Sequence, residues 1–471
     1  MKKKRWIKWA IIIAISYLII GAIAPFVNQK EITKETASNF NAQAVMDMEG
    51  SSDRAMLLET NQSAWEERIR LLNQAKDNIV LVTFDMRYGE STQDLASILL
   101  HKADEGVKVS ILVDGFNGSF RMNGSNFFYA LSSHPNITIK LYNPIHLLTS
   151  WTSQGRMHDK YVIVDDLGYI LGGRNTFDYF IGNYNSNSKS LDREVLIYNP
   201  NDEDSSIYQI KDYFKNIWNK AECKLFGEKE SYKEKKKVKE QIGSLENRYQ
   251  SLQVQYPELF ESYDYGDNTY ATEGVQLLSG STSIYGKEPE VFYELTELMK
   301  CAKNSVTIHT PYAVCNKYMY NMLKEVKKTV PNTHIMLNSI ENGDNVFASS
   351  DYMRNKDKLI NTGIDIYEYD GGTSYHGKTI VIDDNISIIG SYNLDLRSTY
   401  VDTELMLVIK SEDFTEELYS NLDRLEADSR KVITKDKYEV PEHLVINELP
   451  LYKKIIYRIL GLATQPFRYL L

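Results

Sequence analysis

The stretch HDKYVIVDDLGYILGGRN at residues 158–175 has a close counterpart in HGKTIVIDDNISIIGSYN at residues 376–393. A histidine, a lysine, an aspartate, a glycine and an asparagine stand at the same offsets in both copies. A single His-x-Lys means little, but two complete copies of the longer pattern indicate an internal repeat. The corresponding residues are His158, Lys160, Asp165, Gly172 and Asn175 in the first copy, and His376, Lys378, Asp383, Gly390 and Asn393 in the second.

The segments that precede each copy repeat as well. NIVLVTF at residues 78–84 and SVTIHTPY at residues 305–312 both read as strands, and a helical stretch follows each, at residues 92–105 and 317–328. Strands that alternate with helices favour a largely parallel sheet covered by helices on both faces. We therefore predict an α/β protein made of two fused halves related by pseudo-twofold symmetry.

Five parts follow from the repeat and the composition of the chain. The lysine- and glutamate-rich stretch between the halves most simply forms a solvated helix followed by a loop. The predicted parts are an N-terminal membrane anchor at residues 1–28, a first half at 29–227, a linker with a helical insert at 228–273, a second half at 274–440, and an amphipathic tail at 441–471.

The N-terminus predicts the relation of the chain to a membrane. MKKKR is followed by an almost wholly apolar segment at residues 6–27, and roughly 20 apolar residues can cross a bilayer as one helix. The basic residues favour a cytoplasmic N-terminus. We expect a single-pass protein of the cell membrane with its catalytic part on the extracytoplasmic side. A cleaved signal peptide ending near residues 22–24 is the alternative.

The C-terminal segment LYKKIIYRILGL suggests a second membrane contact. Helical spacing places Lys453, Lys454 and Arg458 beside a broad apolar face, which is typical of an interfacial helix. A terminal helix docked on the protein core explains the same pattern, and the sequence leaves the two readings open.

Charge and cysteine content argue against other classes of protein. The net charge is −10 and the pI is about 5.5, a poor match for a nucleic-acid backbone, so we expect no nucleic-acid partner. The three cysteines show no pairing typical of zinc sites or disulfide scaffolds. The sequence indicates no metal, no cofactor and no obligate protein partner.

The motif residues suit phosphodiester chemistry. A strand has a period of two, so the histidine and the lysine of each motif project on the same face. Two halves joined about a twofold axis bring two imidazoles and two ammonium groups to one pocket. The lysines, with Asn175 and Asn393 as neutral donors, can hold phosphate oxygens. One histidine can attack phosphorus while the other protonates the leaving alcohol.

Each imidazole also needs a carboxylate to fix its tautomer and orientation. Asp165 and Asp383 are the carboxylates inside the motifs. Glu194 in LDREVLIY and Glu404 in VDTELMLV follow the motifs at similar places in the two halves. Any one of these acids can be a structural or surface residue, but their repeated placement favours a role at the site.

At these residues the chain resembles the phospholipase D superfamily. Its signature is a paired HxKxxxxD element followed by Gly-Gly or Gly-Ser and an asparagine, here Gly172-Gly173 and Gly390-Ser391. The segments at residues 106–116, 134–144 and 393–398 are most similar to bacterial cardiolipin synthases. The resemblance implies transfer of a phosphatidyl group through a phosphohistidine, from phosphatidylglycerol or a similar lipid to a second phospholipid. We expect His158 to be the nucleophile, although the symmetry of the motifs leaves that choice open.

The chain departs from those synthases in two places. Many of them begin with a two-helix hairpin, whereas this chain has a single apolar span, and PYAVCN at residues 311–316 is less apolar than the family's segment. The acceptor is therefore open. A phospholipase D that releases phosphatidic acid would share every catalytic residue, and a nuclease of the superfamily is the weaker alternative. A catalytically dead scaffold would have lost a motif histidine or lysine, and all four are present.

Overall fold

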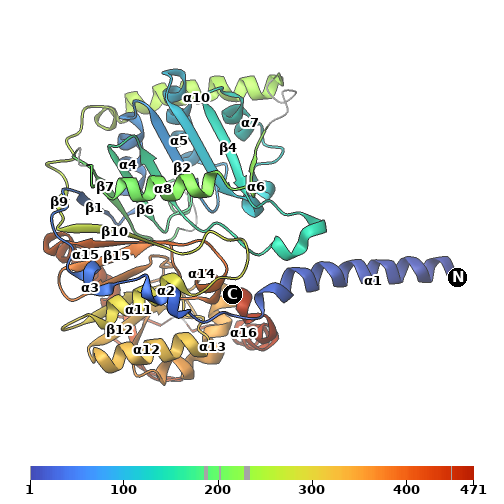
Figure 1. The fold of residues 1–471 in the computed structure, drawn as a ribbon, viewed down its shortest axis with the longest axis vertical. Helices are drawn as coiled ribbons and strands as arrows, with labels where there is room; N and C mark the ends of the chain where they lie inside the picture. Colours follow the sequence, from blue (N-terminus) through green and yellow to red (C-terminus); the bar gives the residue numbers. More distant parts are fainter. Residues whose placement is uncertain (1, 185–188, 201–202, 228–233, 447) are drawn as a thin grey trace.

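Two sheets, one from each half of the chain, lie face to face in the computed structural model (Figure 1). The predicted two-half α/β architecture is confirmed. The structure describes residues 2–184, 189–200, 203–227, 234–446 and 448–471. Residue 1 of the predicted anchor and residues 228–233 of the predicted linker lie outside this part of the chain.

The two sheets have the same internal strand order, which is the structural form of the repeat. Among the described residues each sheet has nine strands. The first runs β8 (Cys223–Leu225), β4 (Ile137–Tyr142), β3 (Lys108–Asp114), β2 (Asn78–Thr83), β5 (Tyr161–Val164), β6 (Gly168–Gly172), β7 (Glu194–Tyr198), β1 (Arg54–Leu58) and β9 (Tyr270–Ala271). The second runs β10 (Gly274–Ser279), β16 (Leu405–Lys410), β15 (Ile386–Gly390), β14 (Thr379–Ile382), β11 (Val306–His309), β12 (Thr333–Asn338), β13 (Asp365–Tyr369), β17 (Ser429–Thr434) and β18 (Lys437–Glu439).

The prediction of largely parallel sheets is wrong. In the described residues only β2–β3–β4 and β11–β12–β13 pair in parallel, and the other neighbours are antiparallel. The motif segments themselves cause this. β5 and β6 are joined by three residues, as are β14 and β15, and a connection that short can only join antiparallel strands.

Helices cover the outer face of each sheet. The strands alternate, so that Ile79 and Leu81 of β2 face these helices while Val82 faces the other sheet. On the first sheet the outer helices are α4 (Asn61–Asn73), α5 (Glu90–Asp104), α7 (Asn126–Ser133) and α10 (Lys236–Gln255). On the second they are α11 (Glu290–Lys300), α12 (Lys317–Thr329) and α13 (Val346–Ile360).

The inner faces of the two sheets share one core. Val195 and Ile163 of the first sheet lie in the same buried cluster as Leu405 and Val381 of the second. Two equivalent helices, α8 (Ile207–Trp218) and α15 (Glu412–Ala427), add apolar side chains to this layer, between the sheets (Figure 1). The halves are therefore one packed body, and the site between them is fixed by this core.

Two segments pack differently from the expectation. The helix predicted in the linker is α10, and it is docked rather than solvated, because Val238, Leu245 and Leu252 are buried against the first half. The start of the predicted first half, with α2 (Lys34–Ser38) and α3 (Ala42–Met46), packs on the second half. Phe26 at the end of η1 (Ala24–Phe26) is buried in the core of that half.

The two terminal helices lie on the same side of the molecule (Figure 1). α1 (Lys2–Ile23) extends away from the body, and Arg5–Phe26 is long and apolar enough to cross a membrane. α16 (Leu451–Ala463) packs along α13 through Tyr457 and Gly461 and leaves its apolar side exposed. Among the described residues, the remaining helices are α6 (Gly115–Arg121), α14 (Leu396–Tyr400), η2 (Leu147–Thr152), η3 (Pro257–Leu259) and η4 (Gln465–Leu470).

Candidate active site

Each motif begins on a segment that is hydrogen-bonded to the other half. An isolated parallel bridge pairs Met157 with Thr403, and its symmetry mate pairs Tyr375 with Leu191. The backbone N–H of His376 donates to the Leu191 carbonyl at 2.6 Å, and that of His158 donates to the Thr403 carbonyl at 3.3 Å. The backbone therefore carries each histidine to the boundary between the halves.

Each imidazole contacts a carboxylate supplied by the opposite half. Nδ1 of His158 lies 2.8 Å from Oε1 of Glu404, and Nδ1 of His376 lies 2.7 Å from Oδ2 of Asp192. A carboxylate on Nδ1 fixes the tautomer and the ring plane, and leaves Nε2 as the reactive nitrogen. Glu404 was among the predicted site residues. Asp192 was not.

The strand register explains why Asp192 was missed. In the first half Gly172 pairs with Glu194, and in the second Gly390 pairs with Met406. Glu194 therefore corresponds to Met406, and Asp192 corresponds to Glu404. The similar letters LDRE and VDTE suggested instead that Glu194 corresponds to Glu404. The strands do not match in this way, because the loop before the strand is longer in the first half. The strand register, which the sequence did not reveal, was the signal needed.

The four basic groups of the motifs are buried together, and burial is the largest cause of the lowered pKa of each. Burial, followed by the charges of Lys160, Lys378 and His376, lowers the pKa of His158 well below its usual value. Burial and Lys378 lower the pKa of His376. Burial lowers the pKa of Lys378, and burial with repulsion from Lys378 lowers that of Lys160 to about 7. Each of the four groups therefore lacks the solvation that stabilises its protonated form in water.

The two orienting carboxylates differ in their electrostatic state. Burial alone would raise the pKa of Asp192, but Lys378 and His376 outweigh it and lower that pKa to about 2. Burial dominates at Glu404 and raises its pKa to about 8. The hydroxyls of Ser391 and Ser398 donate to Glu404, which keeps it in place. The pseudo-symmetric site is therefore chemically asymmetric.

The predicted phosphate donors are buried in the same region. Asn175 accepts a hydrogen bond from the Asp85 backbone N–H at 3.2 Å through its Oδ1. Among the described residues, the side-chain NH₂ groups of Asn175 and Asn393 have no protein acceptor, and Oδ1 of Asn393 is buried without a partner. Both amides therefore keep donors available for a ligand.

The structure places the in-motif aspartates away from the imidazoles. Asp165 and Asp383 take up the left-handed conformation in the turns after β5 and β14, with φ of 48° and 53°. The carboxylate of Asp165 accepts the backbone N–H groups of residues 76–78, and that of Asp383 those of residues 303–305. They fasten the motif hairpin to the start of the neighbouring strand. Their expected place beside the imidazoles is corrected by these contacts.

Glu194 is also outside the cluster. Its carboxylate accepts two hydrogen bonds from the Arg68 guanidinium at 2.7 Å each, and Arg174 lies 3.8 Å away. The two arginines account for a buried carboxylate that touches neither histidine. The expectation that Glu194 orients an imidazole is corrected accordingly.

The motif glycines make room for the carboxylates. A Cβ at Gly173 would lie 2.2 Å from Oδ1 of Asp192, and one at Gly172 would lie 2.5 Å from Cγ of Glu194. Ser391 stands at the position equivalent to Gly173 and donates to Glu404 instead. At Gly390 a Cβ would lie 2.1 Å from the Leu405 carbonyl.

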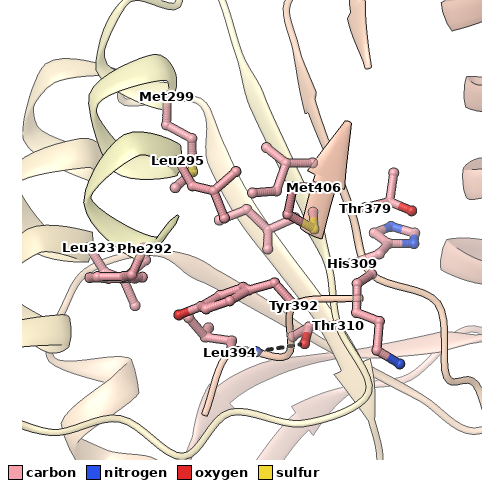
Figure 2. A pocket seen from close by; sticks show the side chains of 13 residues that line it. Phe292, Leu295, Met299, His309, Thr310, Leu323, Thr379, Tyr392, Leu394 and Met406 are labelled. Atoms are coloured by element: carbon pink, nitrogen blue, oxygen red, sulfur yellow. Dashed lines mark hydrogen bonds between the residues drawn. The ribbon is translucent and has the colours of Figure 1, made fainter. Parts of the chain in front are cut away.

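A small cavity borders Lys378 but does not fit a substrate (Figure 2). Its volume is about 30 Å³, which is room for one water. Figure 2 shows Leu295, Met299 and Met406 on one side and Tyr392 and Thr310 on the other. This cavity is a gap in the core of the second half. In the described part of the chain no group of three or more His, Cys, Asp or Glu side chains is placed to hold a metal ion.

Comparison with known proteins agrees with this geometry. A family model described as cardiolipin synthase, PLD-like domain, matches residues 69–218 and 295–426. The chain belongs to this family. It is 26% identical over 403 residues to cardiolipin synthase C of Escherichia coli, covering 75% of this chain and 81% of that protein. It is 23% identical to the major cardiolipin synthase ClsA of Bacillus subtilis, covering 87% and 75%.

A solved structure supports the fold of this PLD-like protein. The chain superposes on a phosphatidylserine synthase from Haemophilus influenzae with a TM-score of 0.66 and 14% identity, over 93% of this chain and 100% of that one. At this identity the likeness shows the fold alone. The family match and the cardiolipin synthase relatives confirm the predicted phospholipase D-like enzyme of the phospholipid phosphatidyltransferase class.

Proposed function

We propose that the chain is a membrane-anchored phosphatidyltransferase of the cardiolipin synthase type, acting through a phosphohistidine. The observation that carries this proposal is the buried cluster of two imidazoles and two ammonium groups, all with lowered pKa values. A phosphodiester monoanion would stabilise the protonated forms of these buried groups, which water does not solvate. The lysines and the amides of Asn175 and Asn393 would hold its oxygens.

Catalysis takes place in two displacements at one phosphorus. In the first, Nε2 of one histidine forms a P–N bond, the P–O bond to the leaving alcohol breaks, and the other histidine gives its proton to that alcohol. In the second, the acceptor hydroxyl attacks phosphorus and loses its proton to the histidine that was the acid in the first displacement, and the P–N bond breaks. A phospholipid hydroxyl gives transfer, whereas water gives hydrolysis.

The asymmetry of the carboxylates supports a division of roles between the two histidines. The pKa of His158 is lowered well below its usual value, so its ring is neutral and nucleophilic. The ring of His376 contacts Asp192, whose pKa of about 2 keeps it anionic, and an anionic partner stabilises an imidazolium. His158 is the nucleophile in this scheme, and His376 is the acid and then the base.

The anchor and the curated relatives support a lipid substrate. α1 presents an apolar surface of membrane-spanning length, and the relatives named above are cardiolipin synthases. The basic start of the chain orients its N-terminus to the cytoplasm and the catalytic body to the opposite side. Phosphatidylglycerol is the proposed donor and acceptor, with glycerol as the leaving alcohol.

Product analysis tests the reaction. The purified full chain is incubated with phosphatidylglycerol vesicles, and the lipids are separated. Cardiolipin with an equal amount of glycerol supports transfer. Phosphatidic acid as the sole lipid product would show that the reaction is hydrolysis and not transfer. His158→Ala and His376→Ala should each abolish turnover. His443→Ala is the matched control, because His443 is exposed and pairs with Asp428. Full activity in either motif variant would overturn the shared-pocket mechanism.

Trapping the intermediate tests the histidine roles. A phosphatidyl ester with a p-nitrophenol leaving group needs little help from an acid, so His376→Ala should still form the phosphohistidine and then stall. His158→Ala should form none. The adduct is recognised by its lability to acid and its stability to base. An adduct in His158→Ala alone would reverse the assignment.

A further inference from the structure

A loop that leads into the first motif packs on the N-terminal helix. This loop, residues 144–152, contains η2 and follows β4. The hydroxyl of Tyr17 in α1 donates to the Leu148 carbonyl at 2.8 Å, and its ring meets that of Trp151 edge to face at 6.5 Å. A Cβ on Gly21 would lie 2.1 Å from Oγ of Ser150. The contact is therefore close and depends on a glycine in α1.

The position of this contact along α1 sets its depth. Residues 6–25, between Arg5 and the buried Phe26, number about 20 and span about 30 Å as a helix, the thickness of a bilayer's hydrocarbon core. Hydrocarbon must therefore begin close to Phe26. Tyr17 lies eight residues before Pro25, which is about 12 Å along the helix. A loop bonded to Tyr17 reaches into the lipid with it.

The loop has the surface that this position requires. Leu148 is 83% exposed, and Ile145 and Trp151 also present apolar surface. Backbone polar groups in lipid need internal partners. Here the backbone N–H of Thr149 donates to the His146 carbonyl, that of Ser153 donates to Ser150, and the Leu148 carbonyl is satisfied by Tyr17.

The base of the loop is fixed to the candidate active site. The side-chain amide of Asn143 donates to the carbonyls of Thr152 and Gly155, at 2.7 and 2.9 Å. Arg156 donates back to the Asn143 carbonyl at 2.8 Å, and two residues later the chain reaches His158. The lipid-facing tip of the loop and His158 therefore belong to one short segment, which these hydrogen bonds hold in place.

Other exposed apolar groups lie on the same side. Phe116 and Phe120 of α6 are exposed, with ring centroids 4.8 Å apart, and α16, which has exposed apolar side chains, lies on the same side of the molecule (Figure 1). Lys453, Lys454 and Arg458 border that side of α16 and complement anionic headgroups. The exposed apolar side chains of α16 are Leu451, Tyr452, Ile455, Ile456, Ile459 and Leu462.

We propose that residues 145–151 insert into the lipid bilayer beside α1 and lead substrate lipid from the bilayer toward His158. The partner is the bilayer itself. The inference rests on the proposed anchoring of α1 and goes beyond it: an anchor alone tethers the enzyme, whereas an inserted loop delivers lipid from the bilayer to the motif.

Depth-dependent quenching tests the insertion. A fluorescent label is placed at Leu148→Cys, at Ile13→Cys in α1, or at the exposed Val254→Cys of α10, in a Cys301→Ser background. Cys223 and Cys315 are buried, and burial raises the pKa of the Cys223 thiol to about 12, so these thiols react slowly. The full chain is reconstituted in phosphatidylglycerol–phosphatidylcholine vesicles that contain nitroxide-labelled phosphatidylcholine.

The three labels separate the possible outcomes. Quenching at residues 13 and 148, with none at 254, supports the inserted loop. Quenching at residue 13 alone would overturn it and leave the anchor intact. No quenching at either residue would overturn the anchoring, and the loop proposal with it.

An activity comparison tests the delivery role. Leu148→Glu places a charge at the tip, and Gly21→Val keeps α1 apolar but removes the space that Ser150 occupies. Both should lower turnover on vesicles about tenfold, the equivalent of losing one buried leucine side chain, and leave turnover of a short-chain monomeric phosphatidylglycerol unchanged. Val254→Glu is the exposed control. Equal losses on both substrates, or no loss on vesicles, would refute the delivery role.

Discussion

Asp192→Asn is the most informative substitution in this protein. Asp192 lies beneath His376, is fully buried, and comes from the half of the chain that does not contain that histidine. Asparagine has nearly the same shape but no charge. The substitution therefore removes the electrostatic support of the His376 imidazolium while the packing around Gly173 stays the same.

The structure sets the size of the effect. Lys378 and His376 lower the pKa of Asp192 from 3.8 to about 2 despite its burial, which corresponds to at least about 2 kcal/mol of attraction. Linkage makes this attraction mutual, so its loss must lower the pKa of the cationic partners. If His376 carries most of the loss, its protonated fraction falls about 30-fold at pH values above its pKa. An asparagine that donates to Nδ1 would also select the wrong tautomer, which can extend the loss to about 10⁴-fold.

The assay is a pH profile of glycerol release from phosphatidylglycerol vesicles. The rate depends on protonated His376, so it falls as pH rises through the His376 pKa. In Asp192→Asn this fall should move about one pH unit or more toward acid, with a lower maximum. Glu194→Gln is the matched control, since Glu194 is two residues away and pairs with Arg68 outside the cluster. It should lower the melting temperature and leave the profile in place. A shifted profile in Glu194→Gln and an unchanged one in Asp192→Asn would refute the register argument.

Three further outcomes follow from the contacts of the site. Gly173→Ala should lower kcat/KM at least about tenfold by displacing Asp192, whose Oδ1 would lie 2.2 Å from the new Cβ. Gly106→Ala is the control, because Gly106 lies in a turn with open space, and this substitution should change stability alone. Asp165→Ala and Asp383→Ala should each lower the free energy of unfolding by about 2 kcal/mol in urea titrations, because each carboxylate accepts three backbone N–H groups. The activity per folded molecule should persist. A 100-fold loss of activity at unchanged stability would show that these aspartates belong to the catalytic cluster. Inorganic phosphate should raise the melting temperature of the protein by relieving repulsion in the basic cluster, and Lys160→Met should weaken that response, as calorimetry can measure.

The sequence was sufficient for those features that rest on local pattern. The repeated motif, the alternating strands before it and the apolar N-terminal run each depend on residues close together in the chain. The structure accordingly contains β2 and β11, α5 and α12, and the long apolar α1 where they were expected. The family match confirms the resemblance carried by the motif pair.

The missed features depend on contacts between distant residues. The partner of His376 is set by a cross-half bridge at Leu191 and by strand register, and neither leaves a local signal. The aspartates of the motif looked catalytic because they repeat, but a hairpin turn that repeats needs the same cap twice. The mixed sheet was missed because the motif was read as one strand instead of a hairpin.

The exchange of carboxylates has a consequence for the origin of the two-half chain. Each histidine is oriented by an acid from the opposite half, so a single half would present an imidazole without its carboxylate partner. The halves must therefore pair for the active site to be complete as well as for the fold to be stable. Fusion into one chain then allows the two equivalent positions to diverge. The first half combines Gly173 with Asp192, which stays anionic, and the second combines Ser391 with Glu404, whose pKa is raised to about 8. A symmetric dimer of one half would hold two identical histidines, whereas a two-step displacement needs one neutral nucleophile and one proton donor. The fused chain can build that difference into the site before the substrate arrives.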